Sequence, residues 1–433
     1  MFDVLIVGAG MVGASLACAL GDKQSGQNAI ATNCNLKVGI IESNGNFLRG
    51  EFTADGRASA IAYGSSQIWQ NIGVWGGMQR RGVTPMHMIQ VSEGDLPYQV
   101  QLRREDMGQE ALGYIVENSV TLASLWEFGR ECSNLELICP AKILDIAYDS
   151  DRDVMRVKIS SEIGEQYLET KLLVGADGGR SQVRQLANIE IEERQYEQTC
   201  IVTTIKSERS HQNFAYERFQ PSGPFAILPL GSDRACIVWT ATKEETPALL
   251  ALDEATFLQE LTKRIGEPLM EKLGKVTLES HKESRKESHE ESHKESRDRA
   301  NYVPRWMHSK TYVQPRLVLI GDAAHTTHPI AGQGMNLGIR DMNALANVLL
   351  IAHQNNEDIG AIAVLNRYQA RRKWDNLSVI WLTDISNRIF SNHNWFFKVI
   401  RRLGLLLLQI SLLKRVLMYF MMGLHQSSSK YKN

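Results

Sequence analysis

The first half of the chain alternates between short apolar runs and segments with helical spacing. Residues 4–7 form a continuous β-branched and apolar run, which is typical of a buried parallel strand. The run leads into the glycine-rich stretch GAGMVG and then into ASLACAL, whose apolar spacing predicts a helix. A second apolar run, KVGIIE, ends at Glu42. This order of strand, helix and strand predicts an α/β domain built on a parallel sheet.

Further along the chain, the apolar positions indicate a second kind of sheet. The segments CIVTTIKS (residues 200–207), FAILPLG (225–231) and RACIVWTAT (234–242) are short and rich in β-branched residues. We expect them to be strands of an antiparallel sheet in a separate layer. A long helix is expected from Met335 through Leu350.

Residues 394–424 are strongly apolar and are interrupted by Arg401, Arg402, Lys414 and Arg415. The longest uncharged piece has about 11 residues, well short of the roughly 20 that span a bilayer. The pattern therefore predicts helices that either close a core or lie on a membrane surface with basic side chains at the headgroups. Packing against the rest of the protein is the simpler interpretation, and peripheral membrane contact is a hypothesis.

Residues 280–299, SHKESRKESHEESHKESRDR, form a low-complexity repeat of Ser, His, Arg and other charged residues. The block has no apolar side chain, so it cannot bury a face. Its histidines recur without a fixed ligand shell, which argues against a metal site. We expect a solvated surface insertion without a chemical role.

The composition fits an ordinary folded protein of two or three domains, with 433 residues, of which 43% are hydrophobic and 22% charged. The net charge of -1 provides no attraction to nucleic acid. The six cysteines include no CxxC pair, which argues against a zinc site or a disulfide framework and fits a reducing cytosol. Because the first strand starts almost at Met1, we expect no signal peptide and a cytoplasmic protein, peripheral to the membrane at most.

The glycines of GAGMVG have separate tasks in a turn between a strand and a helix. Gly8 permits the tight turn, Gly10 lets the backbone approach a pyrophosphate, and Gly13 lets the helix and strand pack closely. The phosphate would meet free N–H groups at the positive helix end. Glu42 closes the second strand, where a carboxylate can accept hydrogen bonds from ribose hydroxyls. These features predict a dinucleotide site but do not separate FAD from NAD.

A second turn, GADGGRS, follows the apolar run KLLVGA and precedes the helical pattern VRQLANI. Arg180 and Arg184 offer charge-assisted hydrogen-bond donors to a phosphate. Asp177 fits either a cofactor-binding turn or a cap for the helix that follows.

The stretch GDAAHTTHPIAGQGMN, residues 321–336, contains few bulky side chains and follows an apolar strand. The carboxylate of Asp322 at the strand end can bind sugar or ribityl hydroxyls. Gly332 and Gly334 open the long helix, whose positive end would stabilise negative charge on a reduced flavin. A nicotinamide enzyme has no use for a second such site so far along the chain. We therefore interpret the two glycine-rich stretches as binding opposite ends of one FAD.

Five segments in this order, GAGMVG, DGRASAIAYGSSQIWQNIGVW, LGYIVENSV, GADGGRSQVR and GDAAHTTHPIAGQGMNLGIRD, resemble the aromatic-hydroxylase flavoproteins. Among them, the ubiquinone-biosynthesis hydroxylases are the most similar branch, and the resemblance covers nearly the whole chain. It implies a para-hydroxybenzoate-hydroxylase-like α/β fold, with a Rossmann-like FAD-binding domain, a discontinuous antiparallel-sheet substrate domain and C-terminal helices. The chain departs from the family pattern at Ser119, where a basic residue is common, and at the 280–299 insertion.

The resemblance divides the chain into interleaved parts. The FAD-binding domain is expected at 1–75, 101–184 and 301–360, the substrate domain at 76–100 and 185–300, and the C-terminal helical region at 361–433. The family pattern assigns the following residues to the cofactor: Gly8, Gly10, Gly13, Glu42, Arg57, Asn118, Asp177, Asp322, Pro329, Gly332, Gln333, Gly334, Met335 and Asn336.

The implied function is a FAD-dependent monooxygenase that uses NAD(P)H and dioxygen to hydroxylate the ring of a prenylated phenol in ubiquinone-type quinone biosynthesis. The cofactor supplies this chemistry, so neither a Ser-His-Asp set nor a metal is needed. His325 and His328 invite a role as general base, but a structural role is favoured and no catalytic base is assigned. Two alternatives stay open: a FAD-binding reductase of prenyl chains, and a non-catalytic, FAD-stabilised subunit of a quinone-biosynthesis complex.

Overall fold

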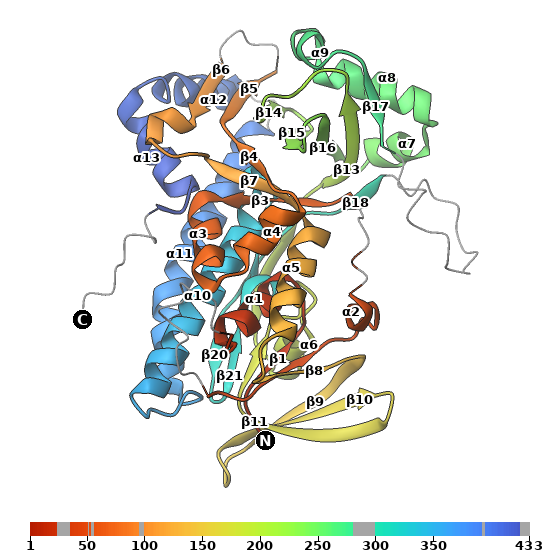
Figure 1. The fold of residues 1–433 in the computed structure, drawn as a ribbon. Coiled ribbons are helices and arrows are strands. Elements are labelled where there is room, and N and C mark those ends of the chain that lie inside the picture. The colour runs from red at the N-terminus through yellow and green to blue at the C-terminus, as the bar shows by residue number, and fades with distance from the viewer. Residues whose placement is uncertain are drawn as a thin grey trace.

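The computed structural model describes residues 1–23, 35–50, 52, 56–94, 99–279, 299–391 and 395–424. Of the predicted insertion at 280–299, all residues except Arg299 lie outside this described part. The chain forms two layers of sheet joined by a small central sheet, with long helices along one side (Figure 1).

The parallel sheet predicted from the N-terminal pattern is confirmed: its parallel strands have the order β21–β11–β1–β2–β8, and β20 adds an antiparallel strand beside β21. Strand β1 (Phe2–Val7) pairs in parallel with β2 (Val38–Ile41) and with β11 (Gly164–Gly175). Strand β11 pairs in parallel with β21 (Leu317–Leu319). Parallel neighbours end at the same edge of a sheet, so the three turns that follow β1, β11 and β21 lie together. These turns are the three glycine-rich motifs.

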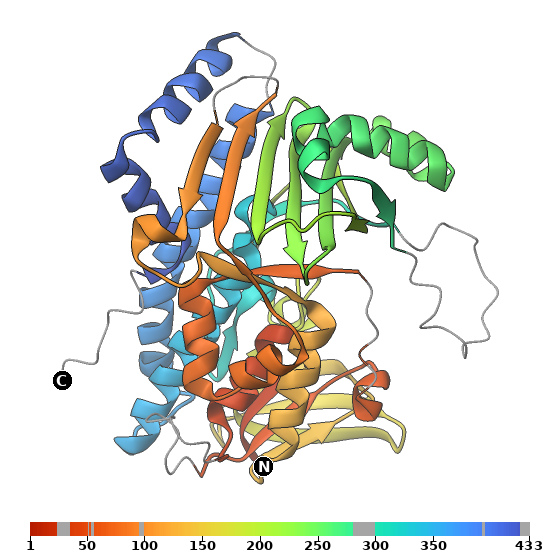
Figure 2. The ribbon, with the colours of Figure 1, turned by 45° about the horizontal axis from the view of Figure 1, so that its top comes forward.

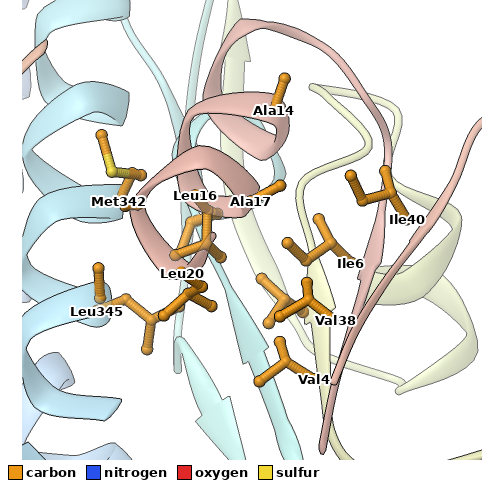
Figure 3. Close-up of a cluster of buried hydrophobic side chains, with 14 of the residues drawn as sticks. Val4, Ile6, Ala14, Leu16, Ala17, Leu20, Val38, Ile40, Met342 and Leu345 are labelled. Carbon is orange, nitrogen blue, oxygen red and sulfur yellow. The ribbon is translucent and has the colours of Figure 1, made fainter. Parts of the chain in front are cut away.

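Helices α1 (Met11–Leu20) and α10 (Gln333–Gln354) pack together over this sheet, and α5 (Asn118–Arg130) packs beside α1. Leu16 and Leu20 of α1 lie between the sheet and the α10 side chains Met342 and Leu345 (Figure 3). All four side chains are fully buried. This apolar contact fixes the first helix of the chain against a helix more than three hundred positions later.

The second sheet has the strand order β17–β13–β16–β15–β14–β5–β6. Strands β13 (Gln198–Ser207), β15 (Gly223–Leu230) and β16 (Arg234–Thr242) confirm the three predicted antiparallel strands. One pair differs, because β14 (Phe214–Gln220) runs parallel to β5 (Met88–Glu93). These two strands come from distant parts of the chain and are not joined by a hairpin, so nothing imposes an antiparallel pairing.

Three short helices cover the outer face of the second sheet. They are α7 (Glu245–Ala251), α8 (Glu254–Ile265) and α9 (Glu267–Leu273), drawn in green in Figure 2. The inner face is turned toward a small sheet of β3 (Ala58–Ala62), β7 (Gly113–Glu117) and β4 (Thr84–Met86). The other elements are α2 (Asn46–Arg49), α3 (Tyr63–Ile72), α4 (Trp75–Arg81), β6 (Gln99–Arg103), η1 (Arg104–Met107), β8 (Leu135–Ile138), β9 (Ala141–Asp149), β10 (Val154–Ser161), α6 (Gln182–Leu186), β12 (Ile191–Gln195), β17 (Val276–Leu278), β18 (Ala300–Tyr302), β19 (Arg305–Ser309), β20 (Val313–Gln314), η3 (Gly321–Ala323), β22 (His325–Thr326) and η4 (Ile330–Gly332).

Three helices end the described chain: α11 (Ile362–Phe390), α12 (Trp395–Leu407) and α13 (Ser411–Met421). Helix α13 buries Met418, and the following Met422 is also buried, in a cluster with Leu102 and Leu112. One face of α13 therefore closes a core. Within the described ranges, none of the helices combines the length and the apolar character needed to cross a membrane.

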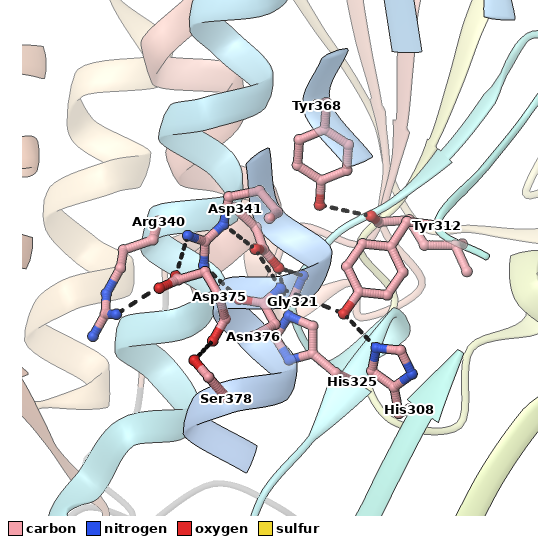
Figure 4. A network of polar contacts seen from close by, with 12 residues as sticks. His308, Tyr312, Gly321, His325, Arg340, Asp341, Tyr368, Asp375, Asn376 and Ser378 are labelled. Carbon is pink, nitrogen blue, oxygen red and sulfur yellow. Dashed lines mark hydrogen bonds and ion pairs between the residues drawn. The ribbon is translucent and has the colours of Figure 1, made fainter. Parts of the chain in front are cut away.

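A buried polar network ties α10 and α11 to the turn after β21 (Figure 4). The Asp341 carboxylate accepts hydrogen bonds from the Gly321 backbone N–H (3.1 Å), from Arg372 Nε (2.8 Å) and from Asn376 Nδ2 (2.9 Å), and it lies 2.6 Å from His325 Nε2. Asp341 is fully buried and Arg372 almost so. Each charge is compensated by the others, which makes the network costly to break.

We expect Asp341→Asn to destabilise the protein by about 3 kcal/mol, because it removes one of the two carboxylates that pair with the buried Arg372 and leaves that guanidinium with Asp375 alone. Chemical unfolding would measure this loss. Asp253→Asn provides a matched control, since Asp253 is exposed and caps α8 through Thr256, a task that Asn performs equally well. Equal unfolding free energies for the two variants would show that the network contributes little.

The same network predicts how stability depends on pH. Burial alone would raise the pKa of Asp341, but His325 and Arg372 outweigh it and hold that pKa at about 2. Because the folded pKa lies below the ordinary value, the contribution of Asp341 is fully present above about pH 4 and is lost as the pH falls toward 2. Unfolding measured across this range should therefore show a steeper acid loss for the wild type than for Asp341→Asn.

Candidate active site

The turn between β1 and α1 leaves the end of a helix open. The Gly8 backbone has a φ of +99°, and a Cβ there would lie 2.7 Å from the Ala176 carbonyl oxygen. A Cβ on Gly13 would lie 2.0 Å from the Gly8 oxygen, so both positions exclude a side chain. Gly10, in contrast, is exposed and an added Cβ would meet no atom within 4 Å. Gly10 precedes α1 without any side-chain cap, so the N–H groups of the first turn remain available to a ligand.

Glu42, at the end of β2, stabilises this turn through hydrogen bonds. Its Oε2 accepts a hydrogen bond from the Ala9 backbone N–H at 2.8 Å, and its Oε1 accepts one from the Asn44 N–H at 2.8 Å. The carboxylate is half-buried and a carboxylate has about four acceptor sites, so it can also accept from a ribose hydroxyl.

The turn after β11 is held by internal contacts. The Asp177 carboxylate accepts hydrogen bonds from Ser181 Oγ and from the backbone N–H groups of Gln182 and Val183, so it caps α6. Burial raises the pKa of Asp177 even though these donors favour its charged form. Of the two predicted phosphate donors, Arg180 is exposed, whereas Arg184 is buried and donates to the carbonyl oxygens of Ala323 and Gly179. Two N–H groups of Arg184 therefore hold this turn in place, and a role of the two arginines as phosphate donors stays a prediction.

The turn after β21 lies against the first turn of the chain. Gly321 has a φ of +58°, and a Cβ there would lie 3.2 Å from the Val12 side chain. A Cβ on Gly338 of α10 would lie 2.6 Å from the same side chain. The GAGMVG and GDAAH stretches therefore meet at Val12, a contact residue that the sequence pattern alone did not single out. Asp322 is exposed beside this contact, and no described residue donates a hydrogen bond to its carboxylate.

The N-terminus of α10 is fastened to β3. The Asn336 amide donates to the Ala60 and Gly332 carbonyl oxygens, at 2.9 Å each, and accepts from the Ala62 N–H at 2.8 Å. This side chain is thus committed to positioning the helix. Gly332 has a φ of +59° and precedes α10 without a side-chain cap, so this helix end is also open to a ligand.

The other predicted cofactor residues of this stretch surround the same helix end. Pro329, Gly334 and Met335 are half-buried, and Gln333 is buried.

Arg57 and Asn118, which are far apart in sequence, are neighbours in the structure. The Asn118 N–H donates to the Arg57 carbonyl oxygen at 3.0 Å, and Ser59 Oγ donates to Asn118 Oδ1 at 2.7 Å. Asn118 begins α5, and the Arg57 side chain is exposed. The structure therefore brings this pair to the strand ends of the small central sheet.

Neither histidine of the third motif is free to act on a substrate. His325 is buried and bonded to Asp341. His328 is fully buried against the Tyr196 ring, and its Nε2 lies 3.3 Å from Gln198 Oε1. Burial lowers the pKa of His328 to about 3, so the ring is neutral and a poor proton acceptor near neutral pH.

An apolar pocket opens at the α10 end, next to Gln333 and Asn336. The other lining residues come from β3 to β6 and from the end of the chain: Ala60, Ala62, Met86, Ile89, Leu102, Leu112, Met418, Met421 and Met422. No charged side chain lines it. The Met422 carbonyl oxygen accepts a hydrogen bond from the Gly64 N–H at 2.8 Å, which fixes the end of α13 over the pocket. The methionines were visible in the sequence, but their place here depends on tertiary packing.

FAD is a long cofactor that needs contacts to its phosphates, its hydroxyl groups and its ring, one after another along its length. The site offers two open helix ends, an exposed carboxylate near them and close-packed glycines, and this set fits FAD.

Comparisons with known proteins agree with this geometry. Residues 1–375 match the family model described as FAD binding domain. The ubiquinone hydroxylase UbiL of Rhodospirillum rubrum is 37% identical over 97% of this chain and 89% of its own. The 3-demethoxyubiquinol 3-hydroxylase of Escherichia coli is 32% identical over 98% of both chains.

A solved structure shares the fold. The crystal structure of the p-nitrophenol 4-monooxygenase PnpA of Pseudomonas putida DLL-E4 has a TM-score of 0.73 over 98% of both chains, at 17% identity. The predicted para-hydroxybenzoate-hydroxylase-like α/β fold is confirmed. The chain belongs to the ubiquinone-biosynthesis hydroxylases, a family of FAD-dependent aromatic monooxygenases.

Proposed function

We propose that this protein hydroxylates the aromatic ring of a prenylated phenol on the way to a ubiquinone-type quinone, with NAD(P)H and dioxygen as co-substrates. The observation that carries the proposal is the junction at α10, where an open helix end adjoins an uncharged pocket closed by methionines. The names of the relatives in Rhodospirillum rubrum and Escherichia coli support a substrate of this class.

The predicted cofactor residues have distinct roles in this proposal. The open end of α1 at Gly10 binds the pyrophosphate, Glu42 accepts from the ribose, and Asp322 accepts from ribityl hydroxyls. The positive end of α10 at Gly332 faces the flavin ring. Bound FAD supplies electron transfer from NAD(P)H and the activation of dioxygen.

The pocket suits a substrate with an isoprenoid chain. Met418, Met421 and Met422 offer flexible thioether side chains that adapt to an irregular apolar partner. With Leu102 and Leu112 they exclude water from the space next to the helix end. The protein thereby orients the ring and keeps the reaction site dry.

The outer face of α12 and α13 supports contact with a membrane surface. The following apolar residues are exposed: Leu403, Leu406, Leu407, Ile410, Leu412, Leu413, Val416 and Phe420. Residues 395–424 contain five basic residues and no acidic one. Arg402 and Arg415 are exposed beside the apolar face, a combination that attracts anionic lipid headgroups. Because α13 also closes the pocket, contact here would bring a lipid-soluble substrate to the site.

Replacing Gly10 tests the cofactor site. We expect Gly10→Ala to leave the FAD-free protein as stable as the wild type, because its Cβ meets no atom within 4 Å. FAD affinity, measured by calorimetry, should fall at least about tenfold, or about 1.4 kcal/mol, because the Cβ occupies the approach of the pyrophosphate.

Gly76→Ala provides the matched control. Gly76 lies in α4, and an added Cβ there has a single ordinary contact, at 3.7 Å from Arg80 Nη1. This variant should bind FAD normally. Unchanged FAD affinity in Gly10→Ala would contradict the proposed place of the pyrophosphate.

The membrane contact is tested without truncating the chain, since loss of α13 would also open the pocket. Leu406→Asp combined with Leu407→Asp should reduce cosedimentation with phosphatidylglycerol vesicles at least about tenfold, because each exposed leucine contributes roughly 1.5–3 kcal/mol when buried in lipid. Ile163→Asp, at a remote and highly exposed position, is the control. If the double variant has normal FAD content and binds vesicles as well as the wild type does, this face of α12 and α13 is not the membrane contact.

A further inference from the structure

Glu217 is an acidic residue in the middle of the second sheet. It lies on β14, where it pairs with Val91 of β5 and with Ala226 of β15. Ala226 in turn pairs with Val238 of β16. Directly opposed residues share a face, so these four side chains form one row across the sheet. Glu217 is the one ionisable member of that row.

The neighbours of Glu217 show which way its side chain points. Tyr216 packs into the cluster beneath α8 and α9, and Arg218 donates to the carbonyl oxygens of Arg264 and Ile265 at the end of α8. Successive residues of a strand face opposite sides. Glu217 therefore points to the inner face, together with Ala215 and Phe219.

That inner face is turned toward the cofactor side of the molecule. Ala215 packs in a cluster with Met86 and Ala60, and both of these line the apolar pocket. Phe219 stacks on Phe390 of α11, with ring centroids 3.9 Å apart. Glu217 lies between these two contacts, and Ala215 at one side of it pairs with Ile89, the β5 residue that lines the pocket.

The row around Glu217 is accessible although its strands are central. Val91, Glu217, Ala226 and Val238 are all half-buried, so other side chains cover this part of the inner face only partly. Each member of the row therefore keeps part of its surface open to solvent or to a ligand. No described residue donates a hydrogen bond to the Glu217 carboxylate.

We propose that Glu217 is the residue that binds the hydroxyl group of the phenolic substrate, with its carboxylate accepting a hydrogen bond from the ring O–H. The inference rests on the proposed function and adds to it a charged contact that the lining of the uncharged pocket lacks. A carboxylate left without a partner in apolar surroundings is costly, and a phenol O–H satisfies it. The isoprenoid chain then extends along the methionine-lined pocket.

The electrostatic setting suits this contact. Burial raises the pKa of Glu217 to about 7. The other charged groups near this face, Glu93 of β5 and Arg401 of α12, pair with each other at 2.6 Å. A carboxylate with such a pKa can also take the phenol proton: the ring O–H bond breaks, a carboxyl O–H bond forms, and the proton later passes to solvent.

The test compares a prenylated phenol with its methyl ether, which lacks the donor hydrogen. Dissociation constants for both are measured by calorimetry on the FAD-loaded protein. We expect the wild type to prefer the phenol at least tenfold, and Glu217→Leu to lose that preference. Glu217→Gln, which keeps the shape and an acceptor oxygen, should retain part of it but turn over the phenol more slowly.

Stability and a matched variant separate this role from a structural one. Glu217→Leu should raise the unfolding midpoint, because it removes a half-buried carboxylate to which no described residue donates a hydrogen bond. Glu192→Gln on the exposed strand β12 should leave binding and turnover unchanged.

Two results would overturn the inference. One is a wild type that binds phenol and ether equally well; the other is full preference retained in Glu217→Leu. A protein that binds FAD but neither ligand would refute the proposed function itself, and the inference with it.

Discussion

The close approach of α1, the turn at Gly321 and α10 is the contact on which the rest of the structure depends. Three glycines, Gly13, Gly321 and Gly338, remove the side chains that would hold these segments apart, and Val12 fills the space between them. The apolar side chains of α1 and α10 then close over the sheet. Both helices begin near this junction, so their positive ends lie on one side of the molecule. Neither helix has a side-chain cap, so both ends are open to a ligand. The extended cofactor site is a consequence of this packing.

Polar contacts behind the site keep it in place. Asp341 bonds to the Gly321 backbone on one side and to Arg372 of α11 on the other, so the third motif is held by a helix that has no cofactor residue. Asn336 fastens the start of α10 to β3 in the same way. These contacts hold the segments on both sides of the exposed Asp322 carboxylate. Such rigid support is what an oriented cofactor needs.

The second sheet and the C-terminal helices complete the site from the opposite side. Helix α13 has two faces: its methionines line the pocket, and its leucines and valine are exposed beside basic residues. The two interpretations of the C-terminal pattern, core closure and surface contact, are therefore compatible, because they concern different faces of one helix. Glu217 lies across the same space on the inner face of the sheet, so apolar and polar recognition come from different layers.

The sequence by itself determined the parallel sheet and the three glycine-rich turns, because local spacing and residue type set strand, turn and helix ends, and the resemblance of five segments indicated the FAD family. It also predicted the three strands at 200–207, 225–231 and 234–242, since β-branched runs of that length form strands in most settings. Only the tertiary structure decided that Arg184 serves the fold, that Asn336 positions a helix, and that β14 runs parallel to β5. The contacts of Val12, Met422 and Glu217 were likewise visible only in the tertiary structure. Their roles depend on which distant segments face them, and that information is absent from the local pattern of any one segment.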